Sequence, residues 1–250
     1  MTRKAIIDLD GCCVRFPLFS STEYNLKRRL FSLTNSKPNA RQYIDALIDV
    51  SLSIHDGERV ALIGQNGAGK TTFLRVISGV LYPTQGKSYI NSSEVTLIGS
   101  MGPTLDPELS GVENIFDLAL LHSRSAAWAR SNIDQIVDIS GLGKRISDPV
   151  RTYSTGMAVR LKTSFSLALR PQILLVDEAI GTADHQFLAK IQNKISQLID
   201  YGSVAVIASH NLDFLQRHCS RAVIFDKGRV AFDGPIKDAI SQHLNISAKP

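Results

Sequence analysis

Residues 64–71 read GQNGAGKT and match the pattern G-x-x-x-x-G-K-[ST]. The apolar run 59–63 directly before them predicts a strand, and residues 73–78 directly after them continue as a helix. A strand, a glycine-rich loop and a helix in this order are the context in which this pattern binds phosphate groups. The sequence therefore predicts an α/β domain that binds a nucleotide through this loop.

The residue types of the loop suit the phosphates of ATP. Glycines let backbone N–H groups curl around phosphate oxygens, and the following helix N-terminus adds the positive end of its dipole. We expect Lys70 to reach the β- and γ-phosphates and the Thr71 hydroxyl to hold Mg²⁺. The predicted phosphate-binding set is Gly64, Gln65, Asn66, Gly67, Ala68, Gly69, Lys70, Thr71 and Thr72.

Acidic and imidazole side chains follow two further predicted strands. Asp177 and Glu178 directly follow the apolar run 173–176, and His210 comes shortly after the apolar run 203–208. In a parallel sheet, ligands bind outside the carboxyl ends of the strands, where the phosphate loop also lies. We expect Asp177 to hold Mg²⁺, Glu178 to orient or deprotonate the attacking water, and His210 to position that water at the γ-phosphate.

The remaining pattern alternates apolar strands with helices, which predicts a mostly parallel sheet covered by helices. Two short strands joined by a turn at Asp10-Gly11 are expected first, and a helical block interrupts the sheet. The expected strands are 5–9, 12–16, 46–54, 95–98 and the hairpin 222–226 with 229–232; the expected helical regions are 111–169, 186–200 and 235–244.

Composition limits the class of protein. The chain is 44% hydrophobic and 20% charged, which excludes a disordered or collagen-like chain. Its net charge of +5 does not argue for nucleic acid. Cys12, Cys13 and Cys219 form neither a disulfide framework nor a metal-ligand pattern and suit a reducing cytosol. Because no apolar run reaches about 18–20 residues, we expect a cytoplasmic chain that serves a membrane only through a partner.

The basic excess is concentrated near the N-terminus. Between Arg15 and Asp45 there are six cations and two anions, or +4 of the total +5. Lys27-Arg28-Arg29 lies among Leu26, Leu30 and Leu33, which is typical of a short helix with one apolar stripe and a basic face. That face could meet anionic lipid or the acidic loops of a membrane partner, or it could be an ordinary solvated surface.

A second motif indicates which nucleotide-binding family this is. Residues 153–157 read YSTGM and open a helix shortly before the run 173–178, ILLVDE. With the phosphate loop, this arrangement resembles the ATP-binding subunits of ABC transporters, whose usual signature is L-S-G-G-Q. The Tyr-Ser-Thr-Gly-Met form is similar to the branch that exports bacterial surface polysaccharides: O-antigen, capsule and teichoic acid. Residues 107–115 (PELSGVENI), residues 176–179 (VDEA) and the basic insertion also look like that branch.

The resemblance implies a P-loop NTPase of the ABC ATPase fold, with a RecA-like core sheet, an N-terminal antiparallel β part and an inserted helical subdomain. Residues 1–250 would form a single ABC ATPase domain. Its parts would be a core at 1–98 and 171–235, a helical subdomain at 99–170, a basic insertion at 17–45 and a short C-terminal helix at 235–250.

The resemblance also implies roles for single residues in a homodimer that sandwiches two ATP molecules. Phe16 would stack on adenine, and Asp184 would lie at the dimer contact. Ser100 is the nearest polar residue to the place where the family usually has a Gln that senses Mg²⁺ and the membrane partner. The signature residues of one copy would face the ATP of the other; they are Tyr153, Ser154, Thr155, Gly156 and Met157.

The implied reaction is hydrolysis of ATP with Mg²⁺, coupled to export of a lipid-linked polysaccharide through two copies of a polytopic transmembrane permease. The subunit would lie at the cytoplasmic face of the inner membrane and bind no nucleic acid. Only 236–250 follows the ATPase part, so we expect no carbohydrate-binding domain. Three alternatives stay open: an exporter of lipids, drugs or peptides; a soluble ABC-type switch on ribosomes or DNA; and a nucleotide-binding module without turnover.

Overall fold

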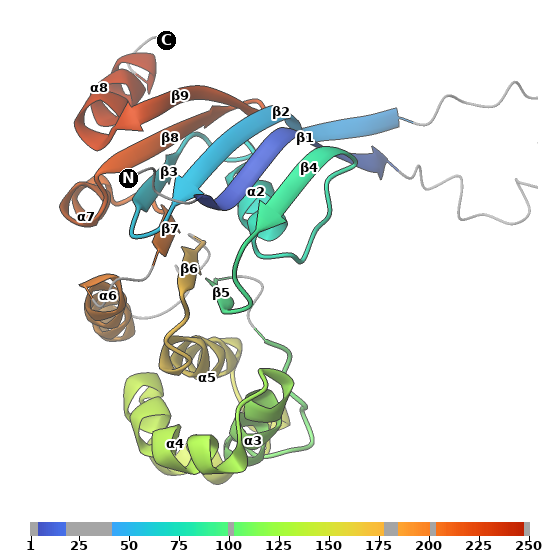
Figure 1. Cartoon of the computed structure of the whole chain (residues 1–250). Helices are drawn as coiled ribbons and strands as arrows, with labels where there is room; N and C mark the ends of the chain where they lie inside the picture. The colour runs from blue at the N-terminus through green and yellow to red at the C-terminus, as the bar shows by residue number, and fades with distance from the viewer. Residues whose placement is uncertain (1–4, 19–41, 100–102, 178–184, 201–203, 248–250) are drawn as a thin grey trace, which may run out of the picture.

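A computed structural model describes residues 5–18, 42–99, 103–177, 185–200 and 204–247. These residues form two sheets with their covering helices and a separate lobe of helices, which lies below the sheets in Figure 1. None of the helices in these ranges combines the length and apolarity that crossing a membrane requires.

The larger sheet carries the phosphate loop. Its strands lie in the order β5 (Val95–Ile98), β6 (Ile173–Val176), β7 (Val204–Ala208), β3 (Arg59–Ile63), β8 (Arg221–Asp226) and β9 (Arg229–Pro235). All neighbours are parallel except β8 and β9, which form the predicted hairpin. The expectation of a mostly parallel sheet is confirmed.

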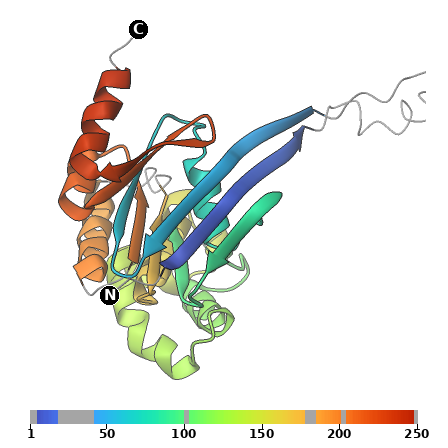
Figure 2. The same ribbon diagram turned by 45° about the horizontal axis from the view of Figure 1, so that its top comes forward.

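The smaller sheet is antiparallel, in the order β2 (Gln42–His55), β1 (Ala5–Leu18) and β4 (Gln85–Ile90). The prediction of two strands and a turn at Asp10-Gly11 is wrong, because β1 is one strand. Gly11 has φ 55° and the register with β2 shifts between Leu9 and Cys12, so the expected turn is an irregularity within the strand. Figure 2 shows β1 and β2 side by side as a long ribbon.

Strand β4 was not predicted, and α7 (Leu212–His218) was not predicted either. The residues of β4 are exposed or half-buried and show no apolar alternation, so the pattern that predicts strands is missing. Helix α7 has seven residues, which is too short for a clear helical period.

The central sheet is buried on both faces. Val204 and Val206 of β7 point toward α2 (Lys70–Ile77), which lies with the antiparallel sheet on one face. Ala205 and Ile207 point to the opposite face. That face is covered by α6 (His185–Asp200), α7 and α8 (Ile236–Ser247), so the predicted helices 186–200 and 235–244 are confirmed.

The helical lobe has a core of its own. It contains α3 (Gly111–Leu121), α4 (Ala126–Ser140), α5 (Thr155–Ala168) and two short 3₁₀ helices, η1 (Gly143–Ser147) and η2 (Val150–Thr152). Ile115, Ile136 and Phe165 are fully buried at its centre. The predicted helical block 111–169 is confirmed, with the two 3₁₀ turns between α4 and α5.

The side chain of Asn114 stabilises the turn that leads into α3, the first helix of this lobe. Its side chain is buried; Oδ1 accepts from the Asp106 N–H at 2.7 Å, and Nδ2 donates to the carbonyl oxygens of Asp106 (3.0 Å) and Ser110 (2.9 Å). Ser110 and Glu113 cap the start of α3 with a reciprocal capping box. One amide therefore satisfies backbone groups on both sides of the turn into α3.

Replacing this amide tests its role. Asn114→Ala should lower the free energy of unfolding by about 1–3 kcal/mol, because buried backbone groups lose their partners. Chemical denaturation followed by circular dichroism measures the change. The control is Asn91→Ala at an exposed position, which should change stability little; equal effects of the two substitutions would contradict the assignment.

Candidate nucleotide-binding site

The backbone of the phosphate loop requires glycine at two tight positions. Gly64 has φ 150°, and a Cβ there would lie 2.4 Å from the Phe225 carbonyl oxygen. Gly69 has φ 112°, and a Cβ there would lie 2.9 Å from the Ala46 carbonyl oxygen. Helix α2 begins directly after Gly69, so its first N–H groups, which have no partners within the helix, open toward the loop.

The β8–β9 turn braces this loop. The Gly228 N–H donates to the Ala68 carbonyl at 2.9 Å, and the Gly228 carbonyl accepts from the Ile48 N–H at 2.8 Å. Gly228 is buried, and a Cβ on it would lie 2.9 Å from the Ala46 carbonyl oxygen. The turn therefore joins the phosphate loop to β2 through backbone hydrogen bonds.

A pocket of about 290 Å³ lies over the loop. It is lined by Ile44, Asp45 and Ala46 of β2, by Gln65, Asn66, Gly67, Gly69, Lys70, Thr71 and Thr72, and by Asp177. Most of the predicted phosphate-binding residues thus surround one space, and Asp177 joins them from a distant part of the chain.

Thr71 and Asp177 are in contact. Thr71 Oγ1 donates a hydrogen bond to Asp177 Oδ1 at 3.2 Å, and the Asp177 N–H donates to the Ile98 carbonyl at 2.8 Å. The Asp177 side chain is buried. A hydroxyl oxygen next to a carboxylate oxygen, with room for phosphate oxygens, suits Mg²⁺, which takes one or two protein ligands and keeps water or phosphate for the rest. The described residues contain no cluster of three or more His, Cys, Asp or Glu that could hold a metal ion by themselves.

Lys70 places a buried positive charge in the same pocket. Its side chain is 8% exposed, and Nζ donates to the carbonyl oxygens of Gly64 and of Gln65, the latter at 3.1 Å. Burial lowers the pKa of Lys70, and the Asp177 carboxylate opposes this by raising it. Phosphate oxygens carry negative charge and are stronger acceptors than carbonyl oxygens, so the pocket suits an anionic ligand.

One histidine that follows β7 and another on α8 interact electrostatically, and the charge of Lys70 also acts on the second. His210 follows β7, two residues after its end. Burial lowers the pKa of His243 on α8, and the charges of Lys70 and His210 lower it further. No local pattern in the sequence marks His243, because α8 comes from the far end of the chain.

Phe16 lies one strand away from the pocket. It stands on β1 opposite Ile44, which lines the pocket, and it is 37% exposed. Residues directly opposite in an antiparallel pair share a face of the sheet, so Phe16 lies on the same face as Ile44.

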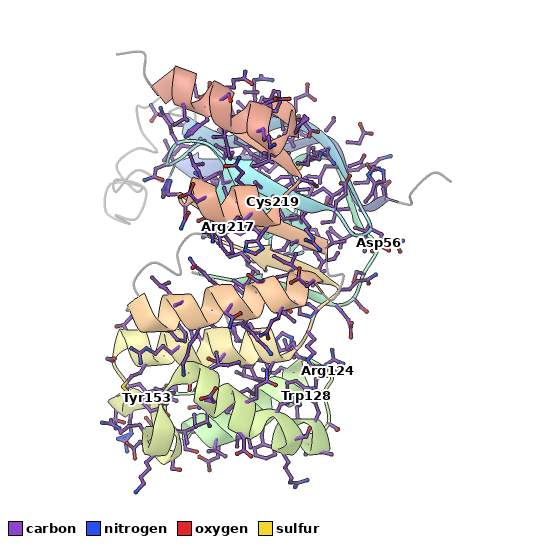
Figure 3. The ribbon with its side chains drawn as sticks, turned by 90° about the vertical axis from the view of Figure 1, so that its left-hand side faces the viewer. Asp56, Arg124, Trp128, Tyr153, Arg217 and Cys219 are labelled. Atoms are coloured by element: carbon purple, nitrogen blue, oxygen red, sulfur yellow. The ribbon has the colours of Figure 1, made fainter. Side chains whose placement is uncertain are left out.

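The signature residues are not among those that line the pocket. Ser154 caps α5, where its side chain accepts from the Met157 N–H at 3.2 Å. The Tyr153 hydroxyl donates to the Arg145 carbonyl at 2.8 Å, and Figure 3 shows Tyr153 on the helical lobe. Among the described residues, a Cβ on Gly156 would meet no atom closer than Ser154 Oγ at 3.8 Å, so their packing does not require glycine there.

Three predicted site residues, Glu178, Asp184 and Ser100, lie outside the described residues. The basic segment around Lys27-Arg28-Arg29 also lies outside them.

Comparison with known proteins identifies the family. The sequence profile described as "ABC transporter" matches residues 47–181. The chain belongs to the ABC transporter family.

This ABC protein is 38% identical to the O-antigen export system ATP-binding protein RfbE of Yersinia enterocolitica, over 75% of this chain and 78% of that protein. It is 32% identical to the O-antigen export system ATP-binding protein RfbB of Klebsiella pneumoniae, over 98% of this chain and all of that protein. It is 34% identical to the teichoic acids export ATP-binding protein TagH of Listeria innocua, over 89% and 67%.

Solved structures agree with the fold. An ATP-binding subunit of an ABC transporter superposes with a TM-score of 0.73 at 22% identity, over 95% of this chain and 92% of that chain. A dimeric ATP-binding cassette in a post-hydrolysis state, bound to ADP and Pi, gives 0.71 at 20% identity, over 92% and 98%. The expected ABC ATPase fold and the expected ATPase activity of this ABC protein are confirmed.

A substitution next to Asp177 tests the pocket. A Cβ on Gly99 would lie 2.8 Å from Asp177 Cβ and would push Asp177 away from Thr71. Gly99→Ala should therefore lower ATPase activity by about tenfold or more, the usual cost of displacing a site group by about 1 Å. The measurement is phosphate release at saturating ATP and Mg²⁺.

The matched control is Gly57→Ala. Gly57 also has a positive φ, 73°, but a Cβ there meets nothing within 4 Å in the part of the chain that the structure describes, so alanine adds backbone strain without the clash. If both variants lose activity equally, strain alone explains the effect and the steric argument fails.

Proposed function

We propose that this chain is the ATPase subunit of an ABC exporter that moves a lipid-linked surface polysaccharide across the inner membrane. The observation that supports the catalytic part is the hydrogen bond between Thr71 and Asp177 inside the pocket of the phosphate loop. The names of the relatives, which are O-antigen and teichoic acid export proteins, support a surface polysaccharide as the cargo.

In this proposal the pocket holds ATP by its phosphates. The open N–H groups at the start of α2 and the Lys70 ammonium bind the β- and γ-phosphate oxygens. Thr71 and Asp177 would hold Mg²⁺, which would supply positive charge to neutralise the phosphates when bound. Glu178, the next residue after Asp177, takes a proton from the attacking water or orients it, and His210 positions that water.

Adenine binding is assigned to Phe16. The ring lies on the same face of the sheet as Ile44, which lines the pocket, and part of its surface is exposed. An aromatic side chain in this position can stack on a base, since both groups present a flat π-face.

We propose that two copies form a homodimer with two shared sites. The signature helix N-terminus of one copy, with Ser154 and Gly156, then faces the γ-phosphate bound by the other copy. Asp184 lies at the contact between the copies. The open space around Gly156 supports this, since the partner's nucleotide accounts for a glycine that the chain's own packing does not require. ATP closes the pair and hydrolysis releases it, which drives a membrane partner between two conformations.

The partner in this proposal is a polytopic permease, present in two copies, and the ATPase lies against it at the cytoplasmic face of the inner membrane. Ser100 is the candidate for sensing Mg²⁺ and the permease. Nucleic acid is not a partner. The chain forms a single ATPase domain, in which the lobe between β5 and β6 is the helical subdomain.

The general base is tested with Glu178→Gln. This variant should lower ATP turnover by roughly 10²–10⁴-fold, the usual contribution of a positioned base, and should keep ATP binding. Because hydrolysis releases the dimer, it should also form an ATP-dependent dimer in size-exclusion chromatography. Normal turnover in this variant would exclude Glu178 as the base.

The cargo is tested in cells of the source organism that make only the Glu178→Gln chain. Lipid-linked polysaccharide should accumulate on the inner side of the membrane and disappear from the cell surface. Normal surface polysaccharide together with lost ATPase activity would refute the cargo and leave the ATPase chemistry standing.

A substitution at Gly156 distinguishes a role of this glycine in the dimer from a role in the fold of the single chain. Gly156→Ala should raise the free energy of unfolding by about 0.5–1 kcal/mol, since alanine is the better helix residue and the space is open. In the dimer the added methyl group meets the partner's ATP, so the ATPase rate should fall by about tenfold or more. Thermal unfolding and phosphate release measure the two effects; unchanged ATPase activity would contradict the shared site.

A further inference from the structure

A second pocket lies far from the nucleotide site, between α4, the end of α5 and the segment before β5. Its volume is about 520 Å³. Most of its lining is polar, from Glu94, Arg124, Trp128, Asn132, Gln135 and Arg170. Figure 3 shows Arg124 and Trp128 together, at the opposite end of the helical lobe from Tyr153.

The topology separates this pocket from the chemistry of ATP. Glu94 comes directly before β5, and Arg170 comes shortly before β6. The nucleotide pocket instead uses residues that follow strands, such as Asp177 after β6. The second pocket therefore lies at the end of the sheet where the parallel strands begin, and the nucleotide pocket lies at the end where they finish.

The charges around the pocket are mainly positive. Arg124 Nη2 donates to Glu94 Oε1 at 2.9 Å and to the Leu169 carbonyl oxygen at 3.4 Å, so the charge of Glu94 is matched by that of Arg124. Arg170 is exposed at the rim. Burial lowers the pKa of Lys194 on α6, and the charge of Arg170 lowers it further, so a third cation lies near. The uncompensated charge of this region favours an anion.

Two donors in the pocket wall have no acceptor among the described residues. They are Arg124 Nε and Gln135 Nε2, and both atoms are buried. A buried donor without an acceptor is unfavourable, and most folded proteins avoid it. To cap the carbonyl end of α5, Arg124 needs only the hydrogen bond from Nη2, so this role does not explain why Nε is buried. It also does not explain the buried amide nitrogen of Gln135. An oxygen-rich ligand that enters the pocket supplies acceptors to both donors after small side-chain rotations.

Trp128 and Asn132 indicate what the anion is attached to. The indole ring of Trp128 is half-buried and packs edge-on against Phe165 at 5.9 Å between ring centroids. Such a ring offers apolar surface with a polar edge. Asn132 Nδ2 already donates to the Trp128 carbonyl at 2.8 Å, so Asn132 offers its Oδ1 to hydroxyl groups, and Gln135 offers its amide. Guanidinium groups match phosphate oxygens in pairs.

We propose that this pocket binds a small molecule that carries a phosphate group on a polyhydroxylated ring, a sugar phosphate. The phosphate lies between Arg124 and Arg170, and the ring lies against Trp128 with its hydroxyl groups toward Asn132 and Gln135. The volume falls within the range of about 300–1,000 Å³ that is typical of small-molecule sites.

The chain contains a built-in probe, because Trp128 is its only tryptophan. The experiment titrates glucose 1-phosphate into the full chain and follows tryptophan fluorescence, with saturating ADP and Mg²⁺ present to fill the phosphate loop. A saturable change is expected with glucose 1-phosphate and none with glucose. No saturable change would overturn the proposal.

The decisive variant is Arg170→Gly. Arg170 has φ 49°, a conformation that favours glycine, so this substitution removes the charge while the backbone is preserved. Binding of glucose 1-phosphate should weaken by about tenfold, the loss of one charge-assisted contact. The control is Arg217→Gln on α7, an exposed arginine in the other lobe (Figure 3), which should bind as the unchanged chain does. Equal affinity in Arg170→Gly and in the control would refute the site.

Competition defines the ligand class. Inorganic phosphate should compete more weakly than glucose 1-phosphate, because it lacks the ring that contacts Trp128. Citrate should also compete more weakly, since it offers carboxylates in place of a phosphate. If citrate binds as tightly as glucose 1-phosphate, the phosphate assignment is overturned; if inorganic phosphate does, the sugar part of the proposal is overturned.

Discussion

The hydrogen bond between Thr71 and Asp177 is the contact on which the site depends. It joins the helix after β3 to the end of β6, across a sheet in which β7 lies between the two strands. The two residues can meet because β3 and β6 both run parallel to β7, so that both strands end on the same side of the sheet. The buried ammonium of Lys70 adds a second requirement. A charge taken out of water needs acceptors, here the loop carbonyls, and the negative charge of the Asp177 carboxylate stabilises it further.

The packing beneath the site explains why that edge keeps its geometry. Every residue of β7 is buried, and its side chains alternate between the α2 face and the face covered by α6, α7 and α8. A shift of one residue would exchange these two sets of side chains between the faces, so each side chain would lose the packing partners that it fits. The helical lobe, by contrast, has a separate core around Phe165. The molecule thus combines a firmly registered sheet with a lobe that is stabilised by its own packing.

Local patterns in the sequence were sufficient for the parallel sheet, the phosphate loop and the helical block, because each has a strong period or a glycine-rich motif. They failed where tertiary pairing decides. Strand β4 has no apolar alternation and is a strand because β1 pairs with it. The sequence predicts a turn at Asp10-Gly11 because glycine is common in turns, yet the long pairing with β2 keeps β1 continuous. The charge of Lys70 acts on His243 of the last helix, which no spacing along the chain could indicate.

The β8–β9 turn has a consequence for how this chain can vary. A short turn at the rim of a sheet is ordinarily a place where proteins gain or lose residues with little effect. Here Gly228 is buried and bonded on one side to the phosphate loop and on the other to β2. An added residue would separate those two partners while leaving the hairpin itself intact. The length of an apparently ordinary turn is therefore set by the nucleotide pocket, and related chains should differ in length elsewhere before they differ here.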